Sequence, residues 1–180
     1  MLTFARYRLC MTQNSTLDLK DWKLEPISGA DREVVEAIHL PPDQEVFAGS
    51  LDEVFGRLNE TDAVGLEQGF AVLDPRNDVV GFFVLREGLR RPDWAPPGTV
   101  SLHNFRVRPG FQGKGVGRRC IALLEDWFAR ERLVQPKLML AVNARNAPAI
   151  AAYEKIGFVD TGLRHEGPQG AQFVFVKPMV

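Results

Sequence analysis

Cysteine and histidine are scarce in this chain, and neither forms a recognisable metal-binding pattern. Among 180 residues there are two cysteines, Cys10 and Cys120, and three histidines. The two cysteines stand far apart and form no Cys-x-x-Cys pair, which argues against a disulfide framework and against a zinc finger. We therefore expect no metal site, and we expect reduced thiols, as in a cytoplasmic protein.

A net charge of one sign and long apolar runs are also absent. Lys and Arg total 22 against 23 Asp and Glu, so the formal net charge is -1. This balance excludes a uniformly basic nucleic-acid binder. No apolar run approaches the roughly 18 residues of a membrane span, and Arg6 and Arg8 lie where a signal peptide needs an apolar stretch. We expect neither a nucleic acid nor a membrane as a partner.

The composition that remains fits one globular domain preceded by a tail. With 180 residues, of which 45% are hydrophobic, the chain is long enough to bury a core without disulfides. We predict a flexible tail over residues 1–20 and a domain over residues 21–180. Met11 is an alternative start of the chain, and a start there would remove Cys10.

Hydrophobic periodicity predicts one mixed α/β (α+β) domain. Strands are expected over 22–28, 70–74, 79–85, 99–107, 137–142, 158–165 and 171–178. Helices are expected near 31–39, after Ser50, over 114–132 and over 146–156. Pro41 and Pro42 are expected to end the first helix, because proline cannot continue one. Ser50 and Glu53 form a capping-box pattern for the second helix.

The most informative segment is a glycine-rich turn between the 99–107 strand and the following helix. It reads Gln112-Gly-Lys-Gly-Val-Gly-Arg118. Its three glycines allow a tight turn that exposes successive backbone N–H groups, and the helix adds unpaired N-terminal donors. This cradle, with Lys114 and Arg118 beside it, suits a phosphate or pyrophosphate. The glycine spacing fits neither a P-loop nor a dinucleotide fingerprint.

A second motif lies further along the chain, between Asn143 and Phe158. Asn146 begins a predicted helix, and Tyr153 follows seven positions later, about 10 Å along one face. Together, the Gln-x-x-Gly-x-Gly turn and this Asn-led helix with Tyr-Glu-Lys-x-Gly-Phe resemble the two signatures of the GNAT-type N-acetyltransferases. The resemblance covers roughly residues 22–178 and implies a single GNAT-like domain that uses acetyl-CoA. The fold implied in this way is an α/β (α+β) domain with a mixed, mostly antiparallel sheet of six to seven strands flanked by about four helices.

The resemblance implies that acetyl-CoA binds to both motifs. The backbone of the turn would hold the pyrophosphate, and the edge of the strand at 103–107 would pair with the pantetheine arm. A bulge in that strand would aim an N–H group at the thioester carbonyl. The cofactor-binding residues implied in this way are Phe105, Val107, Gln112, Gly113, Lys114, Gly115, Val116, Gly117, Arg118 and Asn146.

The same resemblance makes Tyr153 the group that protonates the departing CoA thiolate; the alternative is a core aromatic. A primary ammonium near pKa 10.4 loses its proton at pH 7 at a cost of roughly 4.6 kcal/mol, so a base is useful. His103 is the first candidate for a base or water-relay anchor, since arylalkylamine-type members carry a histidine there; the alternative is a histidine satisfied on a strand face. Strand alternation predicts that Ser101, His103, Phe105 and Val107 share one face. Glu45 is the second candidate base.

Charge is unevenly distributed along the chain. Residues 31–60 contain eight acidic and two basic side chains, whereas residues 105–132 contain seven basic and three acidic ones. In the family fold the first helices line the acceptor cleft, so the pattern favours a cationic acceptor beside an anionic cofactor. Solvated helix faces are the alternative explanation. The spacing of Leu40, Gln44 and Phe47 is loosely similar to spermine/spermidine acetyltransferases, from which His103, Asn104 and Arg106 depart.

The sequence therefore predicts an N-acetyltransferase acting on a small cationic amine, polyamine-like or an amino-acid derivative. We expect direct attack in a ternary complex, because no cysteine is placed as an acyl carrier and Cys120 faces the helix core. A protein N-terminal or lysine acetyltransferase and a non-catalytic CoA-binding sensor are the alternatives. The family resemblance also implies a homodimer.

Overall fold

The computed structural model describes residues 21–59, 66–131 and 137–178, so the predicted tail over 1–20 lies outside the described residues. Short 3-10 helices occupy Gly29–Asp31, Gly88–Arg90 and Pro109–Phe111. The other elements follow in the order β1 (Lys23–Ile27), α1 (Arg32–Glu36), α2 (Pro42–Ala48), α3 (Leu51–Leu58), β2 (Glu67–Leu73), β3 (Val79–Arg86), β4 (Thr99–Val107), α4 (Val116–Glu131), β5 (Lys137–Asn143), α5 (Ala147–Ile156), β6 (Val159–Gly167) and β7 (Gly170–Pro178).

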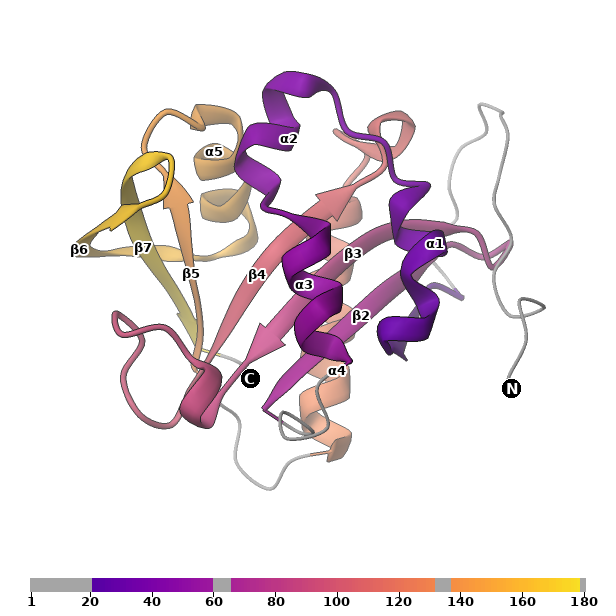
Figure 1. The fold of residues 1–180 in the computed structure, drawn as a ribbon, viewed down its shortest axis with the longest axis horizontal. Helices are drawn as coiled ribbons and strands as arrows, with labels where there is room; N and C mark the ends of the chain where they lie inside the picture. Colours follow the sequence, from indigo (N-terminus) through magenta and orange to yellow (C-terminus); the bar gives the residue numbers. More distant parts are fainter. Residues whose placement is uncertain (1–20, 60–65, 132–136, 179–180) are drawn as a thin grey trace.

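The seven strands form one mixed sheet in the order β1-β2-β3-β4-β5-β7-β6. Every neighbouring pair is antiparallel except β4 and β5, which are parallel. Helices α1 and α3 lie in front of the sheet in Figure 1, and α4 lies behind it. The predicted fold class, a mixed and mostly antiparallel sheet flanked by helices, is confirmed.

Each face of the sheet has its own hydrophobic core. On the face covered by α4 and α5, Cys120, Leu124 and Phe128 pack against strand residues such as Phe83. On the face covered by α1 and α3, Val35 and Phe55 pack against Phe82. We call these the α4–α5 face and the α1–α3 face. Cys120 is fully buried, which confirms its predicted place in the core.

Helix α2 was missed by the sequence analysis, because the two prolines were interpreted only as a helix end. Helix α1 ends at Glu36, before the prolines, and Pro42 occupies the first turn of α2. Proline is tolerated there because the first helical N–H groups have no partner within the helix. Ser50 caps α3 by accepting a hydrogen bond from the Glu53 N–H, as predicted.

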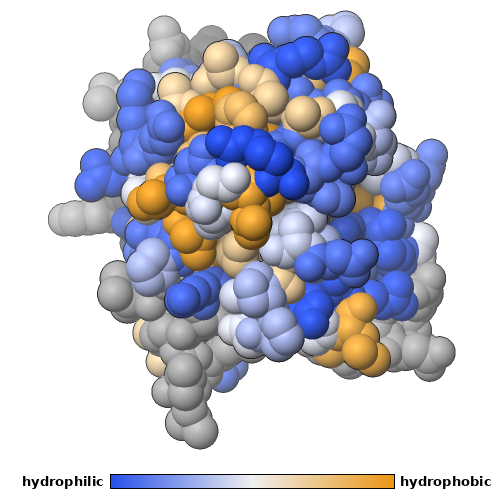
Figure 2. All heavy atoms as spheres, turned by 90° about the vertical axis from the view of Figure 1, so that its left-hand side faces the viewer, coloured by the Kyte–Doolittle hydropathy of each residue, from blue (hydrophilic) through white to orange (hydrophobic). Residues whose placement is uncertain are grey.

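The last helix and the last two strands lie within one or two residues of the ranges expected from the sequence. The Asn146 side chain caps α5 by accepting from the Ala149 N–H, and Gly157 ends the helix at φ +98°. Strand β6 forms one edge of the sheet and exposes Val159 and Leu163. Figure 2 shows this side of the molecule, where apolar atoms gather in groups interrupted by polar ones.

Candidate active site

The glycine-rich turn joins the end of β4 to the start of α4. Gly113 and Gly115 have φ values of +71° and +78°, a conformation that other residues rarely adopt. Residues 113–115 are exposed, and an added Cβ at Gly113 or Gly115 would meet no atom within 4 Å. Glycine is therefore required here by the backbone conformation. Helix α4 begins directly after the turn, so its first N–H groups, which have no partner within a helix, lie beside it.

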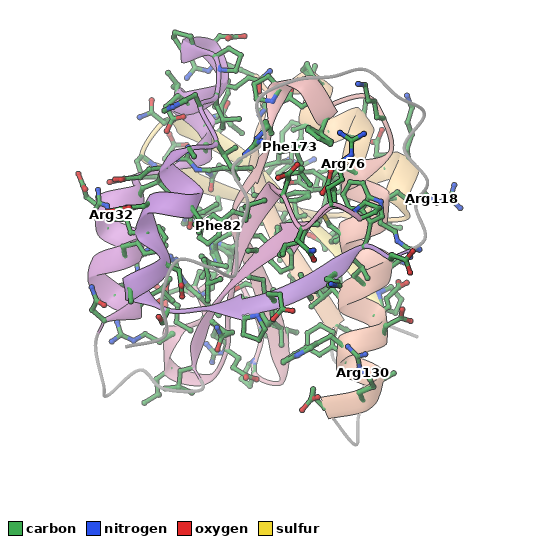
Figure 3. All side chains as sticks on the ribbon, turned by 90° about the vertical axis from the view of Figure 1, so that its right-hand side faces the viewer. Arg32, Arg76, Phe82, Arg118, Arg130 and Phe173 are labelled. Atoms are coloured by element: carbon green, nitrogen blue, oxygen red, sulfur yellow. The ribbon has the colours of Figure 1, made fainter. Side chains whose placement is uncertain are left out.

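Gln112 braces this turn from within. Its Nε2 donates to the Val107 carbonyl at 2.8 Å, and its amide exchanges two hydrogen bonds with the amide of Gln44 in α2. The Gln112 side chain is thus occupied by protein contacts. Lys114 and Arg118 are exposed, and Figure 3 shows Arg118 pointing away from the body of the molecule.

Strands β4 and β5 separate beside the turn. Their parallel ladder joins only three residue pairs, which end at Ser101 and Met139. Beyond these pairs the two strands diverge toward their C-terminal ends, as Figure 1 shows. From Leu102 onward, β4 has no paired strand on this edge among the described residues, and an extended chain can pair with backbone groups at such an edge.

A bulge interrupts β4 within this diverging part. The register against β3 shifts between the pairs made by His103 and Arg106, and Asn104 adopts φ +52°. The extra residue reverses the alternation of side chains. The prediction that Ser101 and His103 share a face with Phe105 and Val107 is therefore wrong: Phe105 and Val107 pack into the core of the α4–α5 face, whereas His103 is paired with Val84 of the other core.

Tyr153 lies on the α4–α5 face, on the helix that Asn146 caps. Its ring lies 6.4 Å from that of Phe105 and 5.6 Å from that of Phe158. Burial raises the pKa of the phenol, and the neighbouring Cys120 adds to the increase. Tyr153 therefore keeps its proton at neutral pH and is suited to donate a hydrogen bond.

His103 lies on the opposite, α1–α3 face. Burial, followed by the charges of Arg86 and Arg57, lowers its pKa to about 3, so the imidazole is neutral at physiological pH. Its Nε2 is 2.8 Å from Ser101 Oγ, and that hydroxyl donates to the Arg86 carbonyl at 3.2 Å. Since the hydroxyl has one proton, Nε2 carries the proton of the imidazole and Nδ1 is left as an acceptor.

Glu45, the other candidate base, contacts a buried arginine. Both of its oxygens accept from Arg106 Nη1, at 2.7 and 2.9 Å, while Arg106 Nη2 donates to the Gly49 carbonyl at 2.6 Å. Arg106 is 1% exposed. Close by, the Asn104 side chain donates to the Ala48 carbonyl. These contacts attach α2 to the bulged part of β4, and the sequence signals neither the burial of Arg106 nor this attachment.

The acidic side chains of residues 31–60 are mostly directed away from the sheet. Six of the eight lie in the α1–α3 helices with their side chains exposed: Glu33, Glu36, Asp43, Glu45, Asp52 and Glu53. Arg32 pairs with both Glu36 and Asp52, and the Asp31 carboxylate accepts a hydrogen bond from the Ser28 N–H. Of the two explanations for this segment, solvated and paired helix faces describe these residues better than an acidic pocket does.

Comparisons with known proteins identify the domain. The model of the Acetyltransferase (GNAT) family matches residues 33–158, which include the glycine-rich turn and α5. The chain belongs to the GNAT acetyltransferase family. The resemblance found in the two motifs is confirmed, and membership supports the enzyme class of acyl-CoA N-acyltransferases.

Individual relatives extend this comparison. The chain is 38% identical over 84 residues to the N-alpha-acetyltransferase RimI of Mycobacterium tuberculosis, which is 47% of this chain and 50% of that protein. It is 29% identical over 143 residues, 76% of this chain, to the uncharacterized N-acetyltransferase YbbJ of Bacillus subtilis and covers 89% of it. It is 44% identical to streptothricin acetyltransferase of Streptomyces lavendulae over 64 residues, 36% of this chain and 33% of that protein. The first of these matches thus spans about half the length of the relative.

Solved structures share the fold at low identity. Aminoglycoside acetyltransferase AAC(6')-Ib, in complex with ribostamycin and coenzyme A, superposes with a TM-score of 0.70 at 18% identity, over 88% of this chain and 94% of that one. Spermidine N-acetyltransferase from Vibrio cholerae, in complex with CoA and spermine, gives 0.67 at 20% identity, over 88% and 96%. In the described part of this chain, no helix is long and apolar enough to cross a membrane.

Proposed function

We propose that this protein transfers an acetyl group from acetyl-CoA to a primary amine, by direct attack in a ternary complex. The observation that carries the proposal is the divergence of β4 and β5 beside the glycine-rich turn, with Tyr153 on one face and His103 on the other. The backbone of residues 113–118 would hold the pyrophosphate, and Lys114 and Arg118 would add positive charge. The pantetheine arm would lie along β4 near Asn146.

The acceptor reacts as the neutral amine, after its ammonium form has lost a proton to solvent, and two groups of the chain then handle the two proton transfers of the reaction. As the amine nitrogen bonds to the thioester carbonyl carbon, its proton passes to Nδ1 of His103, directly or through a water. The low pKa of His103 makes it a weak base and a poor acceptor from an ammonium ion, so it takes the proton only as bonding to carbon makes the nitrogen acidic, or holds the water that carries the proton away. The carbon–sulfur bond then breaks, and Tyr153 donates its proton to the thiolate. We assign Glu45 to holding α2 against Arg106.

The proposal is tested by measuring CoA release over a panel of amino acids, polyamines and peptides. A Tyr153→Phe variant keeps the ring contacts with Phe105 and Phe158 but loses the donor. We expect kcat to fall about a hundredfold, in the range of general-acid contributions, with KM for acetyl-CoA unchanged. Release of no CoA with any amine, or an unchanged kcat in the variant, would overturn the proposal.

A second candidate acceptor is a protein N-terminus, which the similarity to an N-alpha-acetyltransferase favours. Peptides that outperform every free amine in the same panel would support it. A CoA-binding sensor would instead show a raised melting temperature with CoA and no turnover. The cytoplasmic location, the homodimer and the absence of a metal stay predictions.

A further inference from the structure

The α1–α3 face of the sheet carries a row of charged side chains next to His103. Glu67 of β2, Arg86 of β3 and Ser101 of β4 are direct partners across neighbouring strands, so their side chains share one face. Arg57, in the last turn of α3, reaches the same row. Its Nε lies 3.0 Å from Glu67 Oε1, and Arg86 Nε lies 2.9 Å from the same oxygen.

Positive charge exceeds negative charge in this row. Two guanidinium groups share one carboxylate, and both contacts use Nε atoms, so among the described residues the outer Nη groups have no hydrogen-bond partner. The Glu67 side chain is 0% exposed, whereas those of Arg57 and Arg86 are 26% and 19% exposed. The negative charge is therefore enclosed, whereas the two arginine side chains remain partly exposed, although burial lowers the pKa of Arg86.

The excess charge acts on the place where the acceptor amine would react. Ser101, the strand partner of Arg86, lies 2.8 Å from His103 Nε2, and the charges of Arg86 and Arg57 lower the pKa of the imidazole. The same field disfavours an ammonium ion beside His103 and so favours the neutral, attacking form of an amine. It also disfavours an acceptor with several positive charges and favours one with a negative group.

We propose that the acceptor is a primary amine that also carries a carboxylate, as an amino acid does, and that Arg57 and Arg86 bind this carboxylate through their Nη groups. This inference rests on the proposed acetyl transfer and selects between the amino-acid-like and polyamine-like acceptors that the sequence left open. Guanidinium groups suit the role because their planar donors match the two oxygens of a carboxylate. Nearby, the Trp94 ring lies 6.2 Å from that of His103 and 6.5 Å from that of His165, and gives the same face an apolar wall.

The experiment compares matched acceptors that differ only at the carboxylate. Each series contains an amino acid, its amide and its decarboxylated amine, with alanine, leucine, phenylalanine and lysine series and with spermine as the polyamine. kcat/KM is measured for the wild type, Arg57→Gln, Arg57→Lys and Arg86→Gln. Comparing the acid-to-amide ratio between variants cancels the different intrinsic basicity of the acceptors. Arg32→Gln is the control, because Arg32 also pairs with carboxylates but on exposed helix surface, as Figure 3 shows.

We expect the best series to favour the acid, and Arg57→Gln and Arg86→Gln each to reduce the acid-to-amide ratio about ten- to hundredfold, the usual range for a lost hydrogen bond to a charged group. Arg57→Lys should retain most of the preference, and Arg32→Gln should leave it unchanged. Equal reduction of both rates, or a wild type that prefers amides or spermine, would overturn the inference while acetyl transfer stands. Transfer to no amine at all would overturn the proposed function itself.

A measurement on the wild type alone guards against variants that fold poorly. The deaminated analogue of the best amino acid keeps the carboxylate but cannot be acetylated. It should inhibit competitively against the amine acceptor, at least tenfold more strongly than its own amide. Inhibition of equal strength by the two compounds would contradict a carboxylate site.

Discussion

The imidazole of His103 carries a consequence for stability as well as for catalysis. Burial and the charges of Arg86 and Arg57 hold its pKa at about 3, below the 6.5 of an unfolded histidine. Between these two pH values the unfolded chain binds more protons than the folded one. The stability that depends on neutral His103 is therefore fully present above pH 6.5 and is lost as the pH falls toward 3.

This dependence predicts a difference in slope between two proteins. From pH 6.5 down to pH 4, the free energy of unfolding of the wild type should fall more steeply than that of His103→Gln, by about 1.4 kcal/mol per pH unit. Urea unfolding at half-unit pH steps measures both slopes. All other side chains are common to the two proteins, so the difference between the slopes reports on His103. Parallel slopes would mean that the pKa of His103 is the same in the folded and the unfolded protein.

Among the secondary-structure elements, β4 depends on an unusual backbone conformation at Asn104. The residue adopts φ +52°, and its side chain donates to Ala48 in α2. Asn104→Gly and Asn104→Val both remove that hydrogen bond, but only valine is strained at positive φ. We expect Asn104→Val to lose about 1–2 kcal/mol more stability than Asn104→Gly, from the cost of the left-handed conformation for a residue with a Cβ.

The same pair of variants tests whether the bulge matters to the reaction. If an N–H group of the bulge stabilises the thioester oxygen, Asn104→Val should also lower kcat more than Asn104→Gly does. Calorimetry and steady-state kinetics on the two proteins separate the effects. Equal kcat values with unequal stability would assign the bulge to folding alone.

At Asn146, substitutions can distinguish a role in capping helix α5 from a role in binding acetyl-CoA. Its side-chain oxygen caps the helix by accepting from the Ala149 N–H, while its amide N–H₂ remains free to donate to the pantetheine arm that we propose to lie here. Asn146→Asp keeps the capping oxygen and removes the donor; Asn146→Ala removes both. We expect Asn146→Ala to lose about 1 kcal/mol of stability and Asn146→Asp to lose little, with KM for acetyl-CoA raised in both. An unchanged KM in Asn146→Asp would limit Asn146 to capping.

Elements set by contacts between neighbours in the sequence could be predicted, whereas those set by contacts between distant segments could not. The start and end of α5 depend on Asn146 and Gly157, which act on their immediate neighbours, and both were predicted. The family resemblance implied a bulge in β4, but the assignment of Phe105 to a face used strict alternation, which has no marker for one inserted residue. The burial of Arg106 depends on Glu45 and Gly49, contacts between segments distant in the chain. Such pairings are not visible in local patterns.

For the molecule as a whole, segment charge was a poor guide to where charge acts. Arg106 belongs to the basic segment, yet it neutralises Glu45 of the acidic one. The cations next to His103 come from Arg57, inside the acidic segment, and from Arg86, outside both. The fold therefore places positive charge on both faces of the sheet, although the net charge of the chain is -1. An anionic cofactor and an anionic acceptor group would each meet a cation.

The long helix α4 allows the effect of position to be separated from that of net charge. Arg118 lies in its first turn beside the glycine-rich turn, and Arg130 lies twelve residues later, about 18 Å along the axis; Figure 3 shows them near opposite ends. Both side chains are exposed, so replacing either by glutamine removes one positive charge without opening the core. If the turn holds the pyrophosphate, only Arg118 lies within about a Debye length of it at 0.1 M salt.

We therefore expect Arg118→Gln to raise KM for acetyl-CoA about two- to fivefold, consistent with roughly 0.3–1 kcal/mol for an exposed charge. The rise of KM with salt between 0.05 and 0.5 M should also become shallower in this variant. Arg130→Gln should match the wild type in both measurements, although it changes the net charge equally. Equal effects of the two variants would show that acetyl-CoA responds to the overall charge, which would remove the support that Arg118 gives to a pyrophosphate site at the turn.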